Sequence, residues 1–127
     1  MSNISTHAIR SFTLGIGLAV SLLSASFAYA HATLVQSTPA ANAVVASPQQ
    51  IDLMFNETLV PRASRLELAM IHGNSTMPIE HLEIEVIGKT LRAKLHHPLE
   101  AGTYRVQYRA VGPDNHPMTG DFSFTVG

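Results

Sequence analysis

The sequence contains no cysteine and no tryptophan, and only 13% of its 127 residues are charged. Without cysteine no disulfide can form, so the hydrophobic core alone must hold the fold together. The formal net charge is −1 at pH 7. Nucleic-acid-binding proteins normally carry a basic excess, because counterion release drives that binding, and this chain has no such excess. A disordered chain would combine low hydrophobicity with high net charge, whereas 46% of these residues are hydrophobic.

Charge is missing altogether from one long stretch, because no Lys, Arg, Asp or Glu lies between Arg10 and Asp52. Residues 1–30 have a basic start, an apolar run over residues 12–23 and a small-residue end, Ala28-Tyr29-Ala30. This layout is typical of a secretory signal peptide that is cleaved after Ala30. A membrane anchor is the alternative, but a spanning helix needs about 20 predominantly apolar residues. The run here is shorter and is interrupted by Gly and Ser.

Cleavage after Ala30 predicts one mature domain, residues 31–127. It leaves 97 residues, which is the 127 of the chain less the 30 removed. Arg10 is lost with the signal peptide, so 7 basic residues remain against 9 acidic ones. A chain of about 100 residues can bury enough apolar surface to fold without disulfides, with modest stability.

Hydrophobic and polar residues alternate through most of the mature sequence, which is the pattern of strands with one buried face. Six runs show it, at residues 51–56, 65–70, 82–86, 91–95, 104–110 and 121–126, and a short run at 32–36 makes a seventh. Turn-forming residues separate the runs, and Gly88-Lys89 is typical of a tight hairpin. The pattern predicts an all-β fold, a seven-stranded antiparallel β-sandwich of the immunoglobulin type. Tyr104, after Leu99 and Gly102, resembles the tyrosine corner of such folds.

His31 would be the first residue after cleavage. An N-terminal histidine offers two nitrogen ligands, its free amine and its ring Nδ1, and both can bind one metal ion in a closed chelate ring. The pKa of a terminal amine is only about 7.7–8.0, so a metal ion displaces its proton easily near neutral pH. The alternative is that cleavage merely leaves a histidine at this position.

Asp114 and His116 form a second candidate group, flanked by Pro113 and Pro117. Residues i and i+2 of an extended segment point the same way, so the carboxylate and the imidazole can face one ion. The two prolines restrict the backbone around them and favour a preformed loop. Taken alone, the pattern is more typical of a polar turn with a solvated histidine.

Together, the two groups are more specific than either part. Nitrogens from His31 and His116 with an oxygen from Asp114 suit a tetragonal Cu(II) site. Zn(II) can use similar ligands but usually prefers tetrahedral geometry. The lack of cysteine fits a copper-handling protein outside the cytoplasm, because copper then finds no thiol to oxidise.

With these residues in view, the mature chain resembles the CopC family of periplasmic copper-resistance proteins, including its PcoC-type members. The resemblance covers essentially all of the mature chain, and the N-terminal His with the D-x-H pair is its discriminating part. The matching stretches are residues 31–39 (HATLVQSTP), 51–57 (IDLMFNE), 98–106 (PLEAGTYRV), 108–120 (YRAVGPDNHPMTG) and 122–126 (FSFTV).

The resemblance implies a Greek-key β-sandwich, often called cupredoxin-like, that acts in the periplasm in copper homeostasis and resistance as a carrier or buffer. It implies one Cu(II) ion bound by the amine and imidazole of His31, by Asp114 and by His116. Glu57 stands at the family's F-x-E position and is interpreted as a residue that orients a ligand or the terminal amine. Its alternative is a surface carboxylate at a strand end. The implied partners are a CopD-type inner-membrane copper transporter or a multicopper oxidase.

Some family members have a second site that binds Cu(I) in a methionine-rich loop, because thioethers are soft ligands. The matching residues 70–81 contain fewer methionines here, and their candidate Cu(I) ligands are Met70, His72 and Met77. Met70 also continues an inward alternation and can instead belong to the core. His96 and His97 are adjacent, so they are interpreted as surface or turn residues.

Two functions of other classes compete with copper carriage. A terminal histidine chelate with a second histidine resembles the histidine brace of copper oxidases and monooxygenases, although those chains are usually longer and keep an open coordination position, which Asp114 would fill. A metal-independent immunoglobulin-like interaction module is the other alternative, and it predicts no tight metal binding. The sequence favours a copper-binding protein that is not an enzyme.

Overall fold

A computed structural model describes residues 31–127, and the predicted signal peptide lies outside the described residues. The described chain folds into nine strands and no helix, so none of it forms a helix long and apolar enough to cross a membrane. The strands are β1 (Leu34–Thr38), β2 (Val44–Val45), β3 (Gln50–Phe55), β4 (Arg65–His72), β5 (Ser75–Pro78), β6 (Leu82–Ile87), β7 (Thr90–Leu95), β8 (Gly102–Val111) and β9 (Pro117–Val126).

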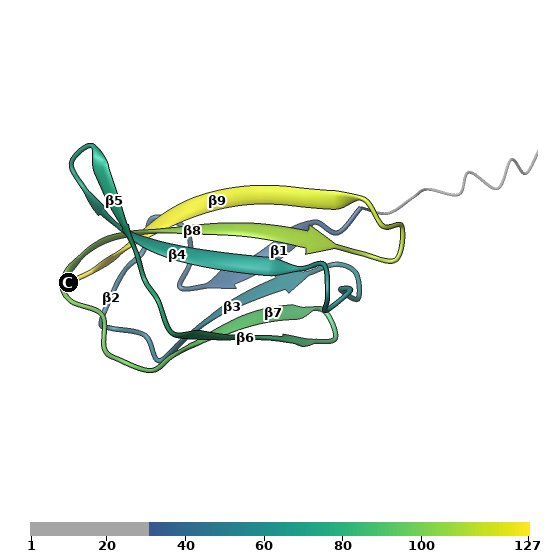
Figure 1. Cartoon of the computed structure of the whole chain (residues 1–127), viewed down its shortest axis with the longest axis horizontal. Helices are drawn as coiled ribbons and strands as arrows, with labels where there is room; N and C mark the ends of the chain where they lie inside the picture. The colour runs from purple at the N-terminus through teal and green to yellow at the C-terminus, as the bar shows by residue number, and fades with distance from the viewer. Residues whose placement is uncertain (1–30) are drawn as a thin grey trace, which may run out of the picture.

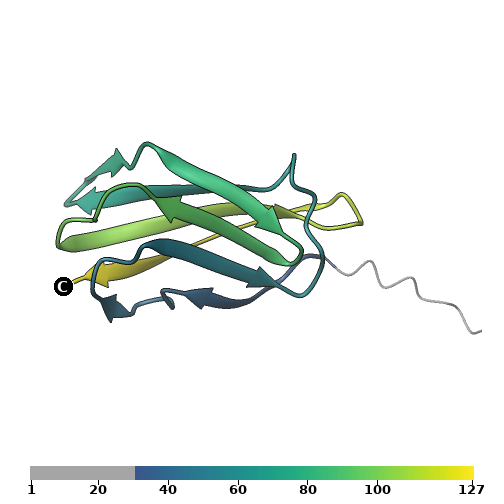
Figure 2. The same cartoon turned by 90° about the horizontal axis from the view of Figure 1, so that it is seen from below.

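The strands form two stacked sheets, which confirms the predicted all-β sandwich (Figure 1). One sheet has the order β1-β3-β7-β6 and the other the order β2-β9-β8-β4-β5. All neighbouring pairs are antiparallel except β2 and β9, which are parallel. Seen from below, the two layers lie one over the other along the length of the molecule (Figure 2).

The core lies between the sheets, where the alternating apolar residues point. Ile51, Leu53 and Phe55 of β3 are each at most 1% exposed, whereas Asp52 and Met54 between them are more exposed. From the other sheet, the rings of Tyr104 and Phe124 stack with centroids 5.7 Å apart. The tyrosine corner predicted at Tyr104 is present, because its hydroxyl donates a 2.6 Å hydrogen bond to the carbonyl of Glu100.

Two short strands add to the seven predicted ones. β2 has only two residues, too few to show a period, and β5 is exposed at every position, so no buried face marks it. The first predicted strand also begins later than residues 32–36 indicate, at Leu34. Its register against β3 shifts between Leu34 and Gln36, and such an irregularity breaks the alternation that would locate the strand.

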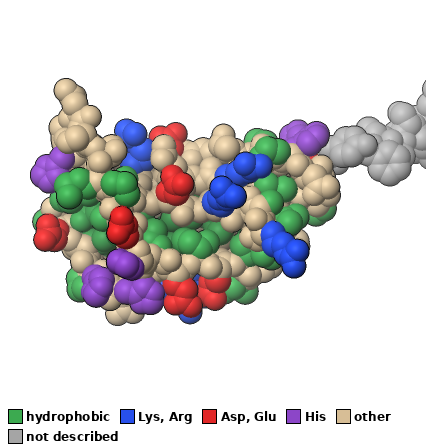
Figure 3. Space-filling model, in the orientation of Figure 1, with side chains coloured by type: hydrophobic (Ala, Val, Ile, Leu, Met, Phe, Trp, Pro, Cys, Tyr) green, Lys and Arg blue, Asp and Glu red, His purple; other side chains and the backbone are tan. Residues whose placement is uncertain are grey.

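The long β8–β9 hairpin places one polar turn at one end of the sandwich. Its ladder runs from the pair Gly102↔Val126 to the pair Val111↔Pro117, where the turn begins. The turn between β4 and β5 and the segment between β7 and β8 lie at the opposite end (Figure 1). On the face drawn in Figure 3, histidine side chains gather at the two ends and not in the middle.

Candidate metal centre

His31 is held at the β8–β9 end by the residues that follow it. Ala32 is 1% exposed and belongs to the core cluster, so it fixes the chain directly after the histidine. Thr33 then exchanges two hydrogen bonds with Asn56 at the end of β3. Its N–H donates to Asn56 Oδ1 at 2.7 Å, and its carbonyl accepts from the Asn56 N–H at 3.1 Å. The alternation of residues 51–56 predicts only which face of the strand is buried, so it does not indicate that Asn56 bonds to Thr33.

Asp114 and His116 stand in the turn that joins β8 to β9. The N–H of Asn115 donates to the Gly112 carbonyl at 3.1 Å, which closes a β-turn with proline at its second position. Asn115 takes a positive φ of 60°, a conformation that asparagine tolerates better than most residues. The N–H of His116 donates to Asp114 Oδ1 at 3.1 Å, so the aspartate side chain caps its own turn.

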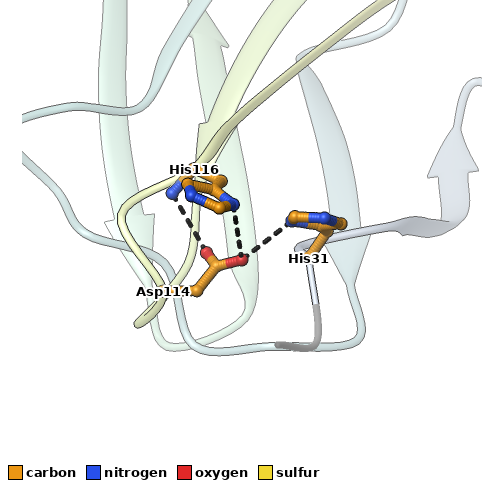
Figure 4. A group of neighbouring side chains, drawn as sticks. All are labelled: His31, Asp114 and His116. Carbon is orange, nitrogen blue, oxygen red and sulfur yellow. Dashed lines mark hydrogen bonds and ion pairs between the residues drawn. The ribbon is translucent and has the colours of Figure 1, made fainter. Parts of the chain in front are cut away.

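The three side chains converge on one point, although His31 and Asp114 are 83 positions apart in the sequence (Figure 4). Asp114 Oδ2 lies 2.8 Å from His31 Nδ1 and 3.7 Å from His116 Nδ1. The two imidazole rings are tilted by 31° with centroids 5.1 Å apart. One potential ligand atom from each residue lies within 4.8 Å of the others. The proximity that the sequence predicts for these residues is therefore present.

The carboxylate is the shielded member of the group. The Asp114 side chain is 5% exposed, whereas those of His31 and His116 are 46% and 61% exposed. Burial by itself would raise the pKa of Asp114. The hydrogen bond from the His116 N–H, the hydrogen bond from His31 and the charges of both histidines outweigh that effect and lower the pKa. Asp114 is therefore ionised near neutral pH, the form in which a carboxylate binds a metal ion.

This arrangement can bind a borderline metal ion at an open end of the protein. Two imidazole nitrogens and one carboxylate oxygen are ligands that suit Cu(II) in tetragonal geometry. The histidine nitrogen that faces Asp114 is Nδ1 of His31, the same atom that would chelate together with a free amine. That these residues bind a metal ion stays a prediction of the geometry.

Glu57 lies close behind the turn. A Cβ placed on Gly112 would be 3.6 Å from the Cβ of Glu57 and 3.5 Å from that of Ala32, so Glu57 stands beside both ligand-bearing segments. Its side chain is half-buried. Within residues 31–127, its carboxylate makes no hydrogen bond to His31 or Asp114. An orienting role for Glu57 therefore stays a prediction.

The candidate Cu(I) ligands lie at the opposite end and are only partly brought together. Met70 of β4 pairs directly with Met77 of β5, so their side chains share one side of the sheet. Both line a hollow of about 260 Å³. His72 pairs with Ser75 further along the hairpin and does not line this hollow. Met70 packs against the core cluster, as its alternation predicts, whereas Met77 is 58% exposed.

His96 and His97 line the same hollow as the two methionines, which the sequence analysis missed. They are exposed, as predicted, but they follow the end of β7 at Leu95 and so are not held on opposite faces of a strand. Only the packing of the β7–β8 segment under the β4–β5 hairpin brings them beside Met70 and Met77. No local sequence pattern carries that information.

The sequence comparisons find one family. Residues 34–127 match the model of the CopC domain. The chain is 36% identical over 124 residues to Copper resistance protein C of Xanthomonas campestris pv. juglandis, covering 94% of this chain and 98% of that protein. It is 39% identical over 105 residues to Copper resistance protein C of Escherichia coli, covering 78% of this chain and 83% of that protein.

The structural comparison finds the same family. The crystal structure of PcoC from Escherichia coli, described as a methionine-rich copper resistance protein, superposes with a TM-score of 0.70. The two are 39% identical, and the match covers 77% of this chain and all of that one. The crystal structure of CopC from Methylosinus trichosporium OB3b superposes with a TM-score of 0.66 at 25% identity, covering 76% of this chain and 93% of that chain. These matches agree with the sandwich described above.

Proposed function

Because the chain belongs to the CopC family, we propose that it binds one Cu(II) ion through His31, Asp114 and His116 and carries or buffers it in the periplasm. The observation that supports this most directly is the convergence of three ligand atoms within 4.8 Å at an open end of the fold. The relatives named for copper resistance make copper the metal to test first.

The proposal requires that residues 1–30 are removed as a signal peptide. Cleavage after Ala30 would free the amine of His31, which then supplies a second nitrogen beside the ring Nδ1 that already faces Asp114. The same step would release the domain into the periplasm. The mass of the protein recovered from the periplasmic fraction tests the cleavage position, and a mass that includes Ala30 would contradict this part of the proposal.

The binding test uses two forms of the protein, one beginning at His31 and one with a single extra residue ahead of it. Cu(II) is titrated into each and followed by electron paramagnetic resonance. We expect tight one-to-one binding with nitrogen hyperfine structure for the first form. The extended form should bind at least about 100-fold more weakly, above the range for loss of an outer-shell partner. The two forms differ by one residue, which turns the His31 amine into an amide and moves the free amine away from the His31 ring, so each controls the other.

Each contrary result has its own meaning. Equal binding by both forms would show that the N-terminus is not a ligand and would leave only the three side chains. Weak binding by both forms would contradict the proposal and favour a metal-independent interaction module. Copper-dependent oxidation of a polysaccharide with added peroxide would favour the histidine-brace enzyme instead, and it is assayed on the same copper-loaded form.

A second, Cu(I)-binding position at the hollow lined by Met70 and Met77 forms the other part of the proposal. Two thioethers with two neighbouring imidazoles, those of His96 and His97, offer the soft and borderline ligands that Cu(I) prefers. Competition with a Cu(I) chelator under reducing conditions tests it. Met77→Leu keeps the apolar volume and removes the sulfur, so it should weaken Cu(I) binding and leave Cu(II) binding unchanged. Unchanged Cu(I) binding in this variant would show that the hollow is not the Cu(I) site.

A carrier must also pass its ion onward. A CopD-type membrane transporter and a multicopper oxidase are the partners that the family resemblance implies. Copper transfer from the loaded protein to each purified candidate, compared with transfer to free chelator, tests that assignment. A transfer rate no faster than dissociation into a chelator would exclude direct handover.

A further inference from the structure

We propose that four basic residues around the candidate metal centre form a docking surface for an acidic face of a protein that exchanges copper with it. This inference rests on the proposed function and names the kind of partner that the site fits. We call the four residues the basic rim: Arg62, Arg65, Lys89 and Arg109.

The rim stands out because the basic residues divide into two groups. Residues 31–127 contain seven Lys and Arg, which are the eight of the chain less Arg10. Three of them are half-buried and paired with acids. Arg92 bonds to Asp52 at 2.7 Å, Lys94 lies 3.2 Å from Glu85 and Arg105 lies 4.0 Å from Asp121. The other four are the rim, and each is exposed and has no ion pair among the described residues.

Backbone contacts place the rim at the same end as the metal centre. Arg62 lies in the turn of residues 60–64, whose Val60 N–H donates to the carbonyl of Val111 at 2.7 Å, next to the β8–β9 turn. The carbonyl of Lys89 accepts a 2.9 Å hydrogen bond from the N–H of Phe55, directly before the Asn56 that anchors the His31 segment. On the face drawn in Figure 3, Lys and Arg side chains without an acidic neighbour lie toward the β8–β9 end.

Arg65 and Arg109 form the most unusual part of the rim. They are directly opposite one another across β4 and β8, where like charges destabilise a sheet. They line a shallow hollow of about 480 Å³ with Thr119. The acidic residues Glu67 and Asp121 line it too. Thr119 is three residues after His116 on β9, which corresponds to about 10 Å along the strand. The repulsion is therefore placed close to the site where copper would enter or leave.

The positive charge of the rim excludes a role in attracting free Cu²⁺ ions. A positive rim repels free Cu²⁺ and would slow its capture from solution, because surface potentials steer ions of opposite sign. The carboxylates that could attract the ion are those of Asp114 and Glu57 at the centre and those of Glu67 and Asp121 at the hollow, and none of them belongs to the rim. The rim therefore does not serve capture of the aquo ion. The rim instead favours an encounter with a negatively charged partner that delivers copper to the centre or accepts copper from it.

An acidic protein fits better than a lipid surface. The rim spans two strands and two turns from both sheets, so it matches an extended face and not one small anion. Its three arginines favour bidentate bonds with carboxylates. His31 and His116 are exposed at this end, so a partner docked on the rim would lie close to the ion. An acceptor protein can offer ligands to that ion. An anionic bilayer that covers the site leaves the ion no path away from it.

The test measures Cu(II) transfer from the loaded protein, beginning at His31, to two peptides. Both start with Gly-Gly-His as the copper-binding head, and one continues with a run of Glu while the other continues with a run of Lys. Stopped-flow absorbance should show transfer to the Glu peptide about tenfold faster at low ionic strength, the lower end of the range for electrostatic steering. Salt near 0.3 M should remove most of the difference, because screening shortens the reach of the charges.

Matched variants locate the effect. Two double variants are compared. The first combines Arg65→Gln with Arg109→Gln, and the second combines Lys94→Gln with Arg105→Gln. Each removes two positive charges, so both change the net charge equally. Only the first pair should slow transfer to the Glu peptide, severalfold, and neither should change Cu(II) affinity, because none of the four residues is a ligand. Equal slowing by both pairs, or no preference for the Glu peptide, would overturn the inference.

Vesicles of phosphatidylglycerol test the lipid alternative. Binding to them that depends on Arg65 and Arg109, without faster transfer to the Glu peptide, would replace the protein partner by a membrane. Failure of the proposed function is distinguishable from all of these results, since a protein that does not bind Cu(II) in the affinity measurement has no transfer step to compare.

Discussion

The two ends of β8 hold their candidate metal-binding groups in different ways. At the Val111 end, the ligands are held by hydrogen bonds. Asp114 bonds to His31 and to the backbone of His116, and the turn is closed by its own hydrogen bond. At the Gly102 end, Met70 and Met77 are held by strand pairing and packing alone, because thioethers accept hydrogen bonds only weakly.

The two candidate sites are therefore held by different interactions, and they also lie far apart. From Tyr104, the partner of Met70, to Val111 the strand covers about 23 Å, too far for one ion to be shared. The hydrogen-bonded end is preorganised and offers nitrogen and oxygen. The other end offers sulfur and imidazole in an open hollow that can adjust. Changes at one end should therefore leave metal binding at the other end unaffected, and four substitutions test this.

Asp114→Asn should separate the two ends most strongly. The amide keeps the size of the side chain but loses the charge and the better oxygen ligand. We expect Cu(II) affinity to fall by at least about 10- to 100-fold, the cost of changing even an outer-shell partner. Cu(I) affinity should not change. Competition titrations with one chelator for each oxidation state measure both, and a parallel loss of both affinities would mean that the variant disturbs the whole fold.

Gly102→Ala should act on the methionine end alone. Gly102 has a φ of 156°, and an added Cβ would lie 2.6 Å from Cε of Met70, so the methionine must move. We expect a loss of about 1–3 kcal/mol in unfolding free energy, typical of overpacking, with weaker Cu(I) binding and unchanged Cu(II) binding. Urea denaturation measures the stability. Combining the change with Met70→Ala should cost less than the sum of both changes, and simple additivity would contradict this mechanism.

Tyr104→Phe should have a smaller effect on stability and none on Cu(II) binding. It removes the 2.6 Å hydrogen bond from the tyrosine hydroxyl to the Glu100 carbonyl, which is worth about 0.5–1.5 kcal/mol. Tyr108→Phe is the matched control, since no hydrogen bond from the Tyr108 hydroxyl is present within residues 31–127. Equal destabilisation by the two changes in urea denaturation would show that the corner contributes nothing specific.

Asn115→Ala should have the smallest effect, and it should be confined to the Cu(II) end. The positive φ at this position is less favourable for alanine, and we expect a cost of about 0.5 kcal/mol, a fraction of the left-handed penalty. Cu(II) affinity should fall less than tenfold, because the turn between the two ligands loosens. Asn115→Gly relieves the strain and should bind as the original does. If the glycine variant loses as much Cu(II) affinity as the alanine variant or more, the asparagine side chain itself contributes to binding.

Alternation at period two was enough to predict the sandwich and its seven main strands, because it directly encodes which face of a strand is buried. It also indicated His31, Asp114 and His116, since ligand types and the i, i+2 spacing can be recognised locally. The match to the CopC family then confirmed the fold class and the connection with copper resistance.

Which distant residues meet depends on long-range packing, which the local sequence does not show. The 83-residue separation of His31 and Asp114 is closed by the Thr33–Asn56 hydrogen bonds and the β8–β9 turn. The same long-range packing places His96 and His97 beside Met70 and Met77 at one hollow, which His72 does not line. It also leaves four basic residues unpaired around one end. Pairing between strands that are distant in the sequence determines which residues become neighbours. Local periodicity indicates only which face of a strand is buried, not which residues lie opposite it.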